Sequence, residues 1–99
     1  MNNFESYIQA STPVVVEFYA DWNDACKRMQ PVMEEVKEIA GDRAVTLRID
    51  VDKHQKIAEQ YGMYSVPGIA IFREGYMVWH KNGMVAAHEI LDHLMPDIK

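Results

Sequence analysis

The sequence predicts an α/β fold with three layers, in which helices cover both faces of a mixed sheet of about four strands. Helical apolar spacings alternate along the chain with short β-branched runs. Strand–helix–strand alternation implies right-handed parallel crossovers. The last two strand-like runs are separated by only a short turn, which adds an antiparallel edge. We therefore expect one domain over residues 1–99.

The N-terminal part of the chain predicts a short helix followed by a buried strand. Apolar residues recur at intervals of three and four over residues 3–10, and Pro13 lies in the break that follows. Residues 14–20 are mostly β-branched or aromatic, which is typical of a strand buried on both faces. Glu17 interrupts this apolar run, so we expect its carboxyl group to be at least partly buried.

A longer helix is predicted over residues 23–40, because apolar side chains fall on one face and charged ones on the other. Pro31 lies inside this pattern and predicts a kink. Gly41 is a suitable residue to end the helix. Residues 45–49 then alternate between apolar and polar, which predicts a strand.

The C-terminal part predicts a short helix over residues 52–60 and then a hairpin. Its strands are residues 69–72 and 77–80, around a turn at residues 73–76. A final helix presents one apolar face, made by Ala87, Ile90, Leu91 and Leu94.

Composition excludes several classes of function. The chain has a formal net charge of -5, which disfavours nucleic acid and anionic membrane surfaces as partners. A single cysteine excludes an internal disulfide and a cysteine-rich metal module. We expect no cofactor and no metal, since the four histidines lack the spacing of a metal site.

The chain shows neither a signal peptide nor an apolar run of the roughly 20 residues that a membrane span needs. We therefore expect a cytoplasmic protein, with a monomer as the default oligomeric state.

Several landmarks occur in order along the chain, and their sequences are Val15-Val16-Glu17-Phe18-Tyr19-Ala20-Asp21-Trp22, Trp22-Asn23-Asp24-Ala25-Cys26-Lys27, Pro31 and Ser65-Val66-Pro67. Together they resemble the thioredoxin family over nearly the whole chain, lacking only that family's usual first strand. The second landmark lies where the family has W-C-G-P-C-K. Asn82-Gly83 is similar to the family's third substrate-contact loop.

The resemblance implies a degenerate redox motif. Asn23 stands where the family has its nucleophilic cysteine, and only the second, normally shielded cysteine remains as Cys26. Thiol–disulfide exchange needs one thiolate to attack and a second thiol to resolve the mixed disulfide. Holding both thiols together is equivalent to effective molarities of about 10⁵–10⁸ M. We therefore expect dithiol exchange to be lost.

Each residue of this motif has a structural interpretation and a functional one. Asn23 and Asp24 suit the start of a helix, as an N-cap and a favourable charge, and otherwise offer polar contacts to a ligand. Cys26 is either an inert core thiol or a slow nucleophile that depends on an external thiol.

Glu17 occupies the position at which the family has a buried aspartate that assists proton transfer. Burial is expected to raise its pKa. Thr46 stands where the family often has a lysine partner for that carboxylate. Glu17 is thus either a relic of redox ancestry or a retained proton acceptor for Cys26.

The resemblance also implies a substrate-binding surface. Pro67 corresponds to the family's cis-proline, whose loop pairs with extended peptides, although a proline here also serves the fold alone. A methionine- and aromatic-rich surface around it is adaptable, unless these side chains fold back on the core. The predicted contact residues, with Met63 and Tyr64 beside them, are Trp22, Asp24, Ala25, Val66, Pro67, Gly83 and Met84.

Taken together, the sequence predicts a thioredoxin-like protein that binds polypeptide and has lost dithiol exchange. The alternative is an oxidoreductase that uses Cys26 alone, with Glu17 as proton acceptor. A third possibility is a passive oligomerisation or scaffold unit.

Overall fold

A computed structural model describes residues 3–95 of the chain. Its elements, in order, are α1 (Asn3–Ile8), β1 (Val14–Tyr19), α2 (Asp24–Ala40), a 3-10 turn (Gly41–Arg43), β2 (Val45–Asp50), α3 (Gln55–Gln60), β3 (Gly68–Arg73), β4 (Tyr76–Asn82) and α4 (Ala87–Leu94).

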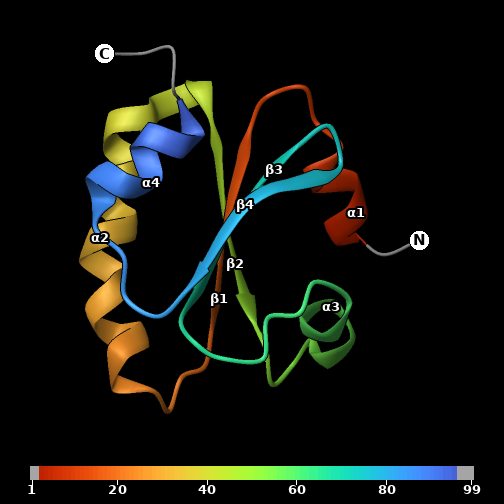
Figure 1. Cartoon of the computed structure of the whole chain (residues 1–99), viewed down its shortest axis with the longest axis vertical. Helices are drawn as coiled ribbons and strands as arrows, with labels where there is room; N and C mark the ends of the chain where they lie inside the picture. Colours follow the sequence, from red (N-terminus) through yellow and green to blue (C-terminus); the bar gives the residue numbers. More distant parts are fainter. Residues whose placement is uncertain (1–2, 96–99) are drawn as a thin grey trace.

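The four strands form one mixed sheet in the order β2-β1-β3-β4. β1 pairs in parallel with β2 and antiparallel with β3, and β3 pairs antiparallel with β4. Figure 1 shows α2 and α4 on one face of the sheet and α1 and α3 on the other. The predicted α/β fold with helices on both faces is therefore confirmed. The connection from β1 through α2 to β2 is parallel as expected. β3, which follows α3, runs antiparallel to β1, so the parallel crossover expected at α3 is wrong.

Several element boundaries differ from the sequence prediction by one to three residues, and two of these differences have a clear local description. α3 begins at Gln55 instead of residue 52, because the Asp50 carboxylate accepts hydrogen bonds from the backbone N–H groups of Asp52 and Lys53 and holds a turn there. The hairpin turn is tighter than predicted. Only Glu74 and Gly75 lie between β3 and β4, with φ of 51° and 90°, as a two-residue turn matched to the strand twist requires.

α2 continues as helix through Pro31. The kink expected at this residue stays a prediction. The helix ends as expected at Gly41, whose φ is 59° and whose N–H donates to the carbonyl of Lys37.

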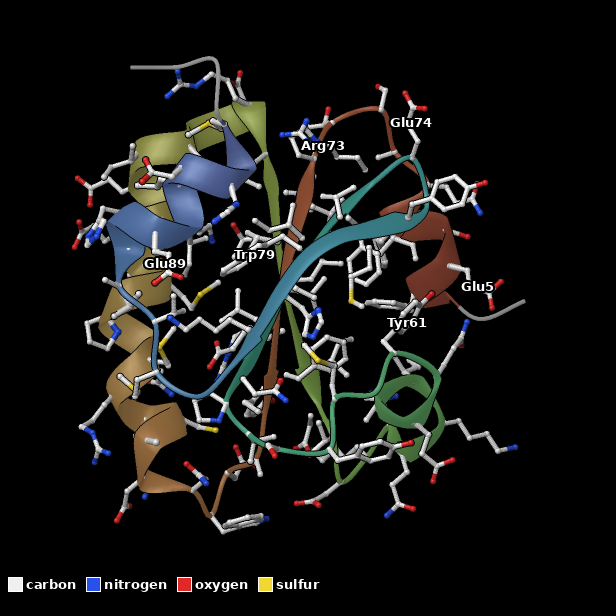
Figure 2. The ribbon with its side chains drawn as sticks, viewed as in Figure 1. Glu5, Tyr61, Arg73, Glu74, Trp79 and Glu89 are labelled. Carbon is white, nitrogen blue, oxygen red and sulfur yellow. The ribbon has the colours of Figure 1, made fainter. Side chains whose placement is uncertain are left out.

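The sheet separates two apolar clusters. The cluster beneath α2 and α4 includes Val15, Met29 and Ile90. Trp79 reaches toward α4 in Figure 2. Its ring stacks on that of His93, with centroids 4.6 Å apart.

The cluster on the opposite face is aromatic. Phe4 from α1 packs edge-on against Phe72 of β3, with ring centroids 5.7 Å apart, and Tyr61 contacts both rings. This cluster holds α1 and the end of α3 against the sheet, as Figure 2 shows around Tyr61.

Alternation along β1 decides where its one charged residue lies. Val14, Val16 and Phe18 pack in the aromatic cluster, whereas Val15 faces α2. Because side chains alternate between the faces of a strand, Glu17 also faces α2. The fold therefore places a carboxyl group in the interior, on the face covered by the helix that carries Cys26.

Candidate functional site

The start of α2 is capped by Asn23. Its backbone is extended, with φ of -97° and ψ of 122°, and its side-chain oxygen accepts a hydrogen bond of 2.9 Å from the N–H of Cys26. A helix leaves its first N–H groups without partners inside the helix, and an asparagine oxygen satisfies one of them. Asn23 thus supplies a hydrogen-bond acceptor for one of the unpaired N–H groups in the first turn of α2.

Cys26 lies one turn into α2 and faces the sheet. Its relative exposure is only 2%. Burial raises the pKa of the Cys26 thiol, and the negative charge of Glu17 raises it further, while the backbone at Ala20 and the charge of Arg48 oppose these effects only in part. A buried thiol with a raised pKa carries less thiolate at neutral pH, and the thiolate is the nucleophile.

Glu17 is completely buried at 0% exposure. Its Oε1 accepts a hydrogen bond of 3.1 Å from Nε of Arg48, its neighbour across the β1–β2 ladder. Its Oε2 has no hydrogen-bond partner among the described residues. Burial raises the pKa of Glu17, and the charge and hydrogen bond of Arg48 lower it by less.

Arg48 connects this interior to the surface. Its guanidinium carbon lies 3.9 Å from the centroid of the Tyr19 ring, a cation–π contact, and its side chain is 42% exposed. Arg48 and Cys26 both line a small pocket of about 80 Å³. The buried carboxyl group, the thiol and a half-exposed cation therefore form one cluster.

The cluster includes a residue that the sequence analysis missed. The sequence has Thr46 where the family often has a lysine that partners the buried carboxylate. In the structure the cation beside Glu17 is Arg48, two residues further along β2. Thr46 pairs instead with Val15. The alternation over residues 45–49 places 46 and 48 on the same face, which was the available signal.

The loops predicted to bind substrate are joined to each other. The Val66–Pro67 peptide bond is cis, and the Pro67 carbonyl accepts a hydrogen bond of 2.7 Å from the N–H of Gly83. A Cβ atom on Gly68 would lie 3.2 Å from the Met63 side chain and 3.3 Å from the Ser65 carbonyl, so these neighbours would have to shift by a few tenths of an ångström to admit a side chain.

Large apolar side chains of these loops are exposed. Trp22 is 69% exposed, and its indole N–H donates a hydrogen bond of 2.8 Å to Asp52. Tyr64 and Met84 are also exposed, whereas Met63 is buried. Of the other predicted contact residues, Asp24 is exposed and Ala25 and Val66 are half-buried.

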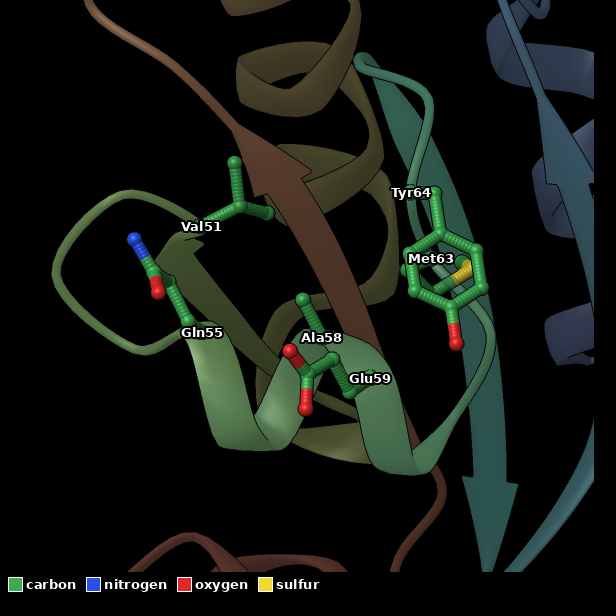
Figure 3. A pocket seen from close by; sticks show the side chains of 6 residues that line it. All are labelled: Val51, Gln55, Ala58, Glu59, Met63 and Tyr64. Carbon is green, nitrogen blue, oxygen red and sulfur yellow. The ribbon is translucent and has the colours of Figure 1, made fainter.

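A hollow of about 160 Å³ lies between α3 and the segment that leads to Pro67. Figure 3 shows Met63 and Tyr64 on one side of it and Val51, Gln55 and Glu59 on the other. Because the exposed Tyr64 lines it, this hollow lies next to the loops predicted to bind substrate.

Among residues 3–95, no group of three or more His, Cys, Asp or Glu side chains is placed to hold a metal ion. In the same part of the chain, the helices are all too short or too polar to cross a membrane.

Comparison with known proteins places this geometry in a family. The family model described as Thioredoxin matches residues 1–95. The chain belongs to the thioredoxin family. The predicted resemblance is therefore confirmed, and the chain contains a single cysteine, Cys26.

Individual relatives agree with this assignment. A thioredoxin of Alicyclobacillus acidocaldarius subsp. acidocaldarius is 36% identical over 73 residues, which cover 74% of this chain and 70% of the relative. Thioredoxin Y, a chloroplastic protein of Oryza sativa subsp. japonica, is 31% identical over 94% of this chain, which spans only 56% of that relative's length. A solved structure of a mutant thioredoxin from Halobacterium salinarum superposes with a TM-score of 0.86 at 28% identity, covering 97% of this chain and 83% of the other.

Proposed function

We propose that this thioredoxin-family chain binds extended polypeptide at the loops around the start of α2 and does not catalyse dithiol exchange. The observation that carries the proposal is the contrast between a thiol that is 2% exposed and a tryptophan, four residues earlier, that is 69% exposed. Contact with a partner is available at this surface, whereas attack by sulfur is not.

The thiol chemistry is disfavoured for two reasons. The family's nucleophile position holds an amide, which cannot form a mixed disulfide. The remaining thiol is buried, and its pKa is raised by that burial and by the charge of Glu17.

Binding is favoured by the arrangement of the loops. The hydrogen bond from Gly83 to the Pro67 carbonyl holds the loops of these two residues together. The hydrogen bond from the Trp22 indole to Asp52 orients the indole ring. Rigid aromatic side chains with exposed apolar area are frequent anchors for protein partners. An extended segment lying across Val66 would contact the loop that carries this residue and also the loops of Trp22 and Gly83.

The test is a titration of the isotope-labelled chain with carboxymethylated insulin B chain, a polypeptide without free thiols or disulfides. We expect amide shift changes at Trp22, Val66 and Gly83. Trp22→Ala should weaken binding by about fivefold or more, as for an interface anchor. The matched control is Tyr76→Ala, an aromatic residue that is 74% exposed at the β3–β4 hairpin, at the opposite end of the sheet from the start of α2 in Figure 1.

Absence of saturable binding, or equal weakening by the two variants, would contradict the proposal. Alkylation of Cys26 by iodoacetamide tests the monothiol alternative separately. We expect slow labelling of the native chain and fast labelling in urea. Fast labelling of the native chain at neutral pH would favour an oxidoreductase that works through Cys26.

A further inference from the structure

The two edges of the sheet are built differently. At the β4 edge, the register with β3 shifts between Ile71 and Phe72, so that Val78 is an extra residue without a partner. Bulges of this kind disturb an edge and discourage further strand pairing. The β2 edge has a continuous register with β1 from Val45 to Asp50, so it stays regular.

Only alternate residues of β2 use their backbone N–H and C=O groups in hydrogen bonds to β1. The N–H of Val45 donates to the carbonyl of Pro13, and the N–H of Val51 donates to the carbonyl of Tyr19, each at 2.9 Å. These odd-numbered residues therefore point their N–H and C=O groups at β1. Because the backbone groups of a strand alternate in direction, Thr46 and Arg48 point theirs away from the sheet, toward the open edge.

An apolar groove of about 390 Å³ lies along this edge, between α1 and α3. Tyr7 is 56% exposed at its rim, so an incoming side chain has aromatic surface to cover. The apolar and aromatic side chains that line it are Phe4, Tyr7, Leu47, Ile49 and Ile57.

The charged and polar groups at this edge of the sheet indicate the chemistry of the occupant. Apart from the Tyr7 hydroxyl, the polar lining comes from Arg48 and His54, and no carboxylate is among the lining residues described. Only Nε of Arg48 is engaged by Glu17, and the side chain is 42% exposed on the α2 face of β2. A carboxylate on an added strand, opposite Arg48, would complement this charge.

The geometry points to a second docking surface, independent of the loops around α2. An extended polypeptide adds to β2 as a new edge strand, bonding to the backbone of Thr46 and Arg48. Its alternate side chains enter the groove and are apolar, and a carboxylate between them faces Arg48. Backbone pairing supplies affinity and the alternating side chains supply specificity, as in other cases of strand addition.

The probe is the synthetic peptide acetyl-Val-Thr-Val-Glu-Val-Thr-amide, which matches the six residues of β2 in length. The comparison peptide replaces its glutamate with lysine. In a titration of the isotope-labelled full chain, we expect saturable binding with amide shifts at Thr46 and Arg48. Affinity should fall with added salt and be about tenfold weaker for the lysine peptide, about what one lost charge pair contributes.

Two variants test the surface itself. Thr46→Pro removes an N–H that β1 does not use, and Tyr7→Glu places a negative charge at the exposed rim without touching the sheet. Each should weaken binding of the glutamate peptide by about tenfold or more. The matched control, Tyr76→Glu at the β4 edge, should bind like the native chain. Tyr7→Glu keeps the test decisive if the proline variant fails to fold.

Three results would overturn the inference. The first is no saturable binding, or shifts confined to Trp22, Val66 and Gly83. The second is a dimer of the native chain, by sedimentation equilibrium, that Thr46→Pro dissociates, since the occupant would then be a second copy. The third is slow hydrogen exchange of the Thr46 and Arg48 amides in the free chain, which would mean that the edge is already covered.

Discussion

The surface at the start of α2 and the interior directly beneath it contrast sharply within a single helical turn. At the surface, Asn23 satisfies the helix backbone and Trp22 is open to a partner. In the interior, Cys26 and Glu17 are buried, and the pKa of each is raised because burial disfavours its charged form. The difference shows that the thiol of this chain lies where burial disfavours its thiolate, whereas the start of the helix presents an amide and an exposed indole.

The largest expected effect comes from returning a thiol to the surface position. Asn23→Cys places a second sulfur at the exposed helix start, where the dipole favours a thiolate and Cys26 lies within one turn to resolve the mixed disulfide. We expect turnover in dithiothreitol-driven insulin reduction to rise by about a hundredfold or more over the native chain, since intramolecular resolution is restored.

Asn23→Ser is the control for this gain, because serine caps the helix and carries no thiol. It should remain as inactive as the native chain. Substantial turnover by the native chain would contradict the loss of dithiol exchange. An inactive Asn23→Cys variant that still folds would show that the surrounding loops no longer support the reaction.

A smaller effect is expected from the buried carboxyl group. Its raised folded-state pKa means that Glu17 stabilises the fold most below the ordinary value of 4.5, and that this contribution is lost as pH rises through the folded value. Glu17→Gln keeps an acceptor for Arg48 and cannot ionise. Its free energy of unfolding relative to the native chain should therefore increase as the pH rises from about 4 to about 8.

Urea unfolding at several pH values measures this difference. The matched control is Glu34→Gln on the exposed face of α2, which should show no comparable trend. A difference between Glu17→Gln and the native chain that does not vary with pH would mean that the carboxyl group stays ionised throughout, against the direction given by its burial.

The smallest effect concerns the cap. Asn23→Ala removes the acceptor for the Cys26 N–H and should lower the free energy of unfolding by about 1 kcal/mol. Asn23→Asp retains a capping oxygen and should restore most of the loss. If alanine proved neutral by urea unfolding, the capping interpretation of this residue would be wrong.

Much of this description was predictable from local patterns. The spacing of apolar residues located the strands and helices, and the interrupted apolar run at Glu17 predicted a buried carboxyl group. The start of α3 was misplaced because Asp50 uses its side chain to hold a turn, and such side-chain bonds compete with helix formation.

Pairings across long stretches of sequence were not predictable in the same way. Arg48 reaches Glu17 across 31 positions, and Trp22 reaches Asp52 across 30. Both depend on the parallel register of β1 and β2, which follows from how whole faces are buried and not from the residues near either partner.

The asparagine at position 23, the single thiol and the order of helices and strands can all be recognised from the amino-acid sequence alone. The cation beside the buried carboxyl group and the open edge of β2 exist only once distant strands are packed together. Periodicity within a segment reports which face of that segment is apolar. Which neighbour meets that face, and which backbone groups then lack a partner, is settled by the packing of the whole molecule.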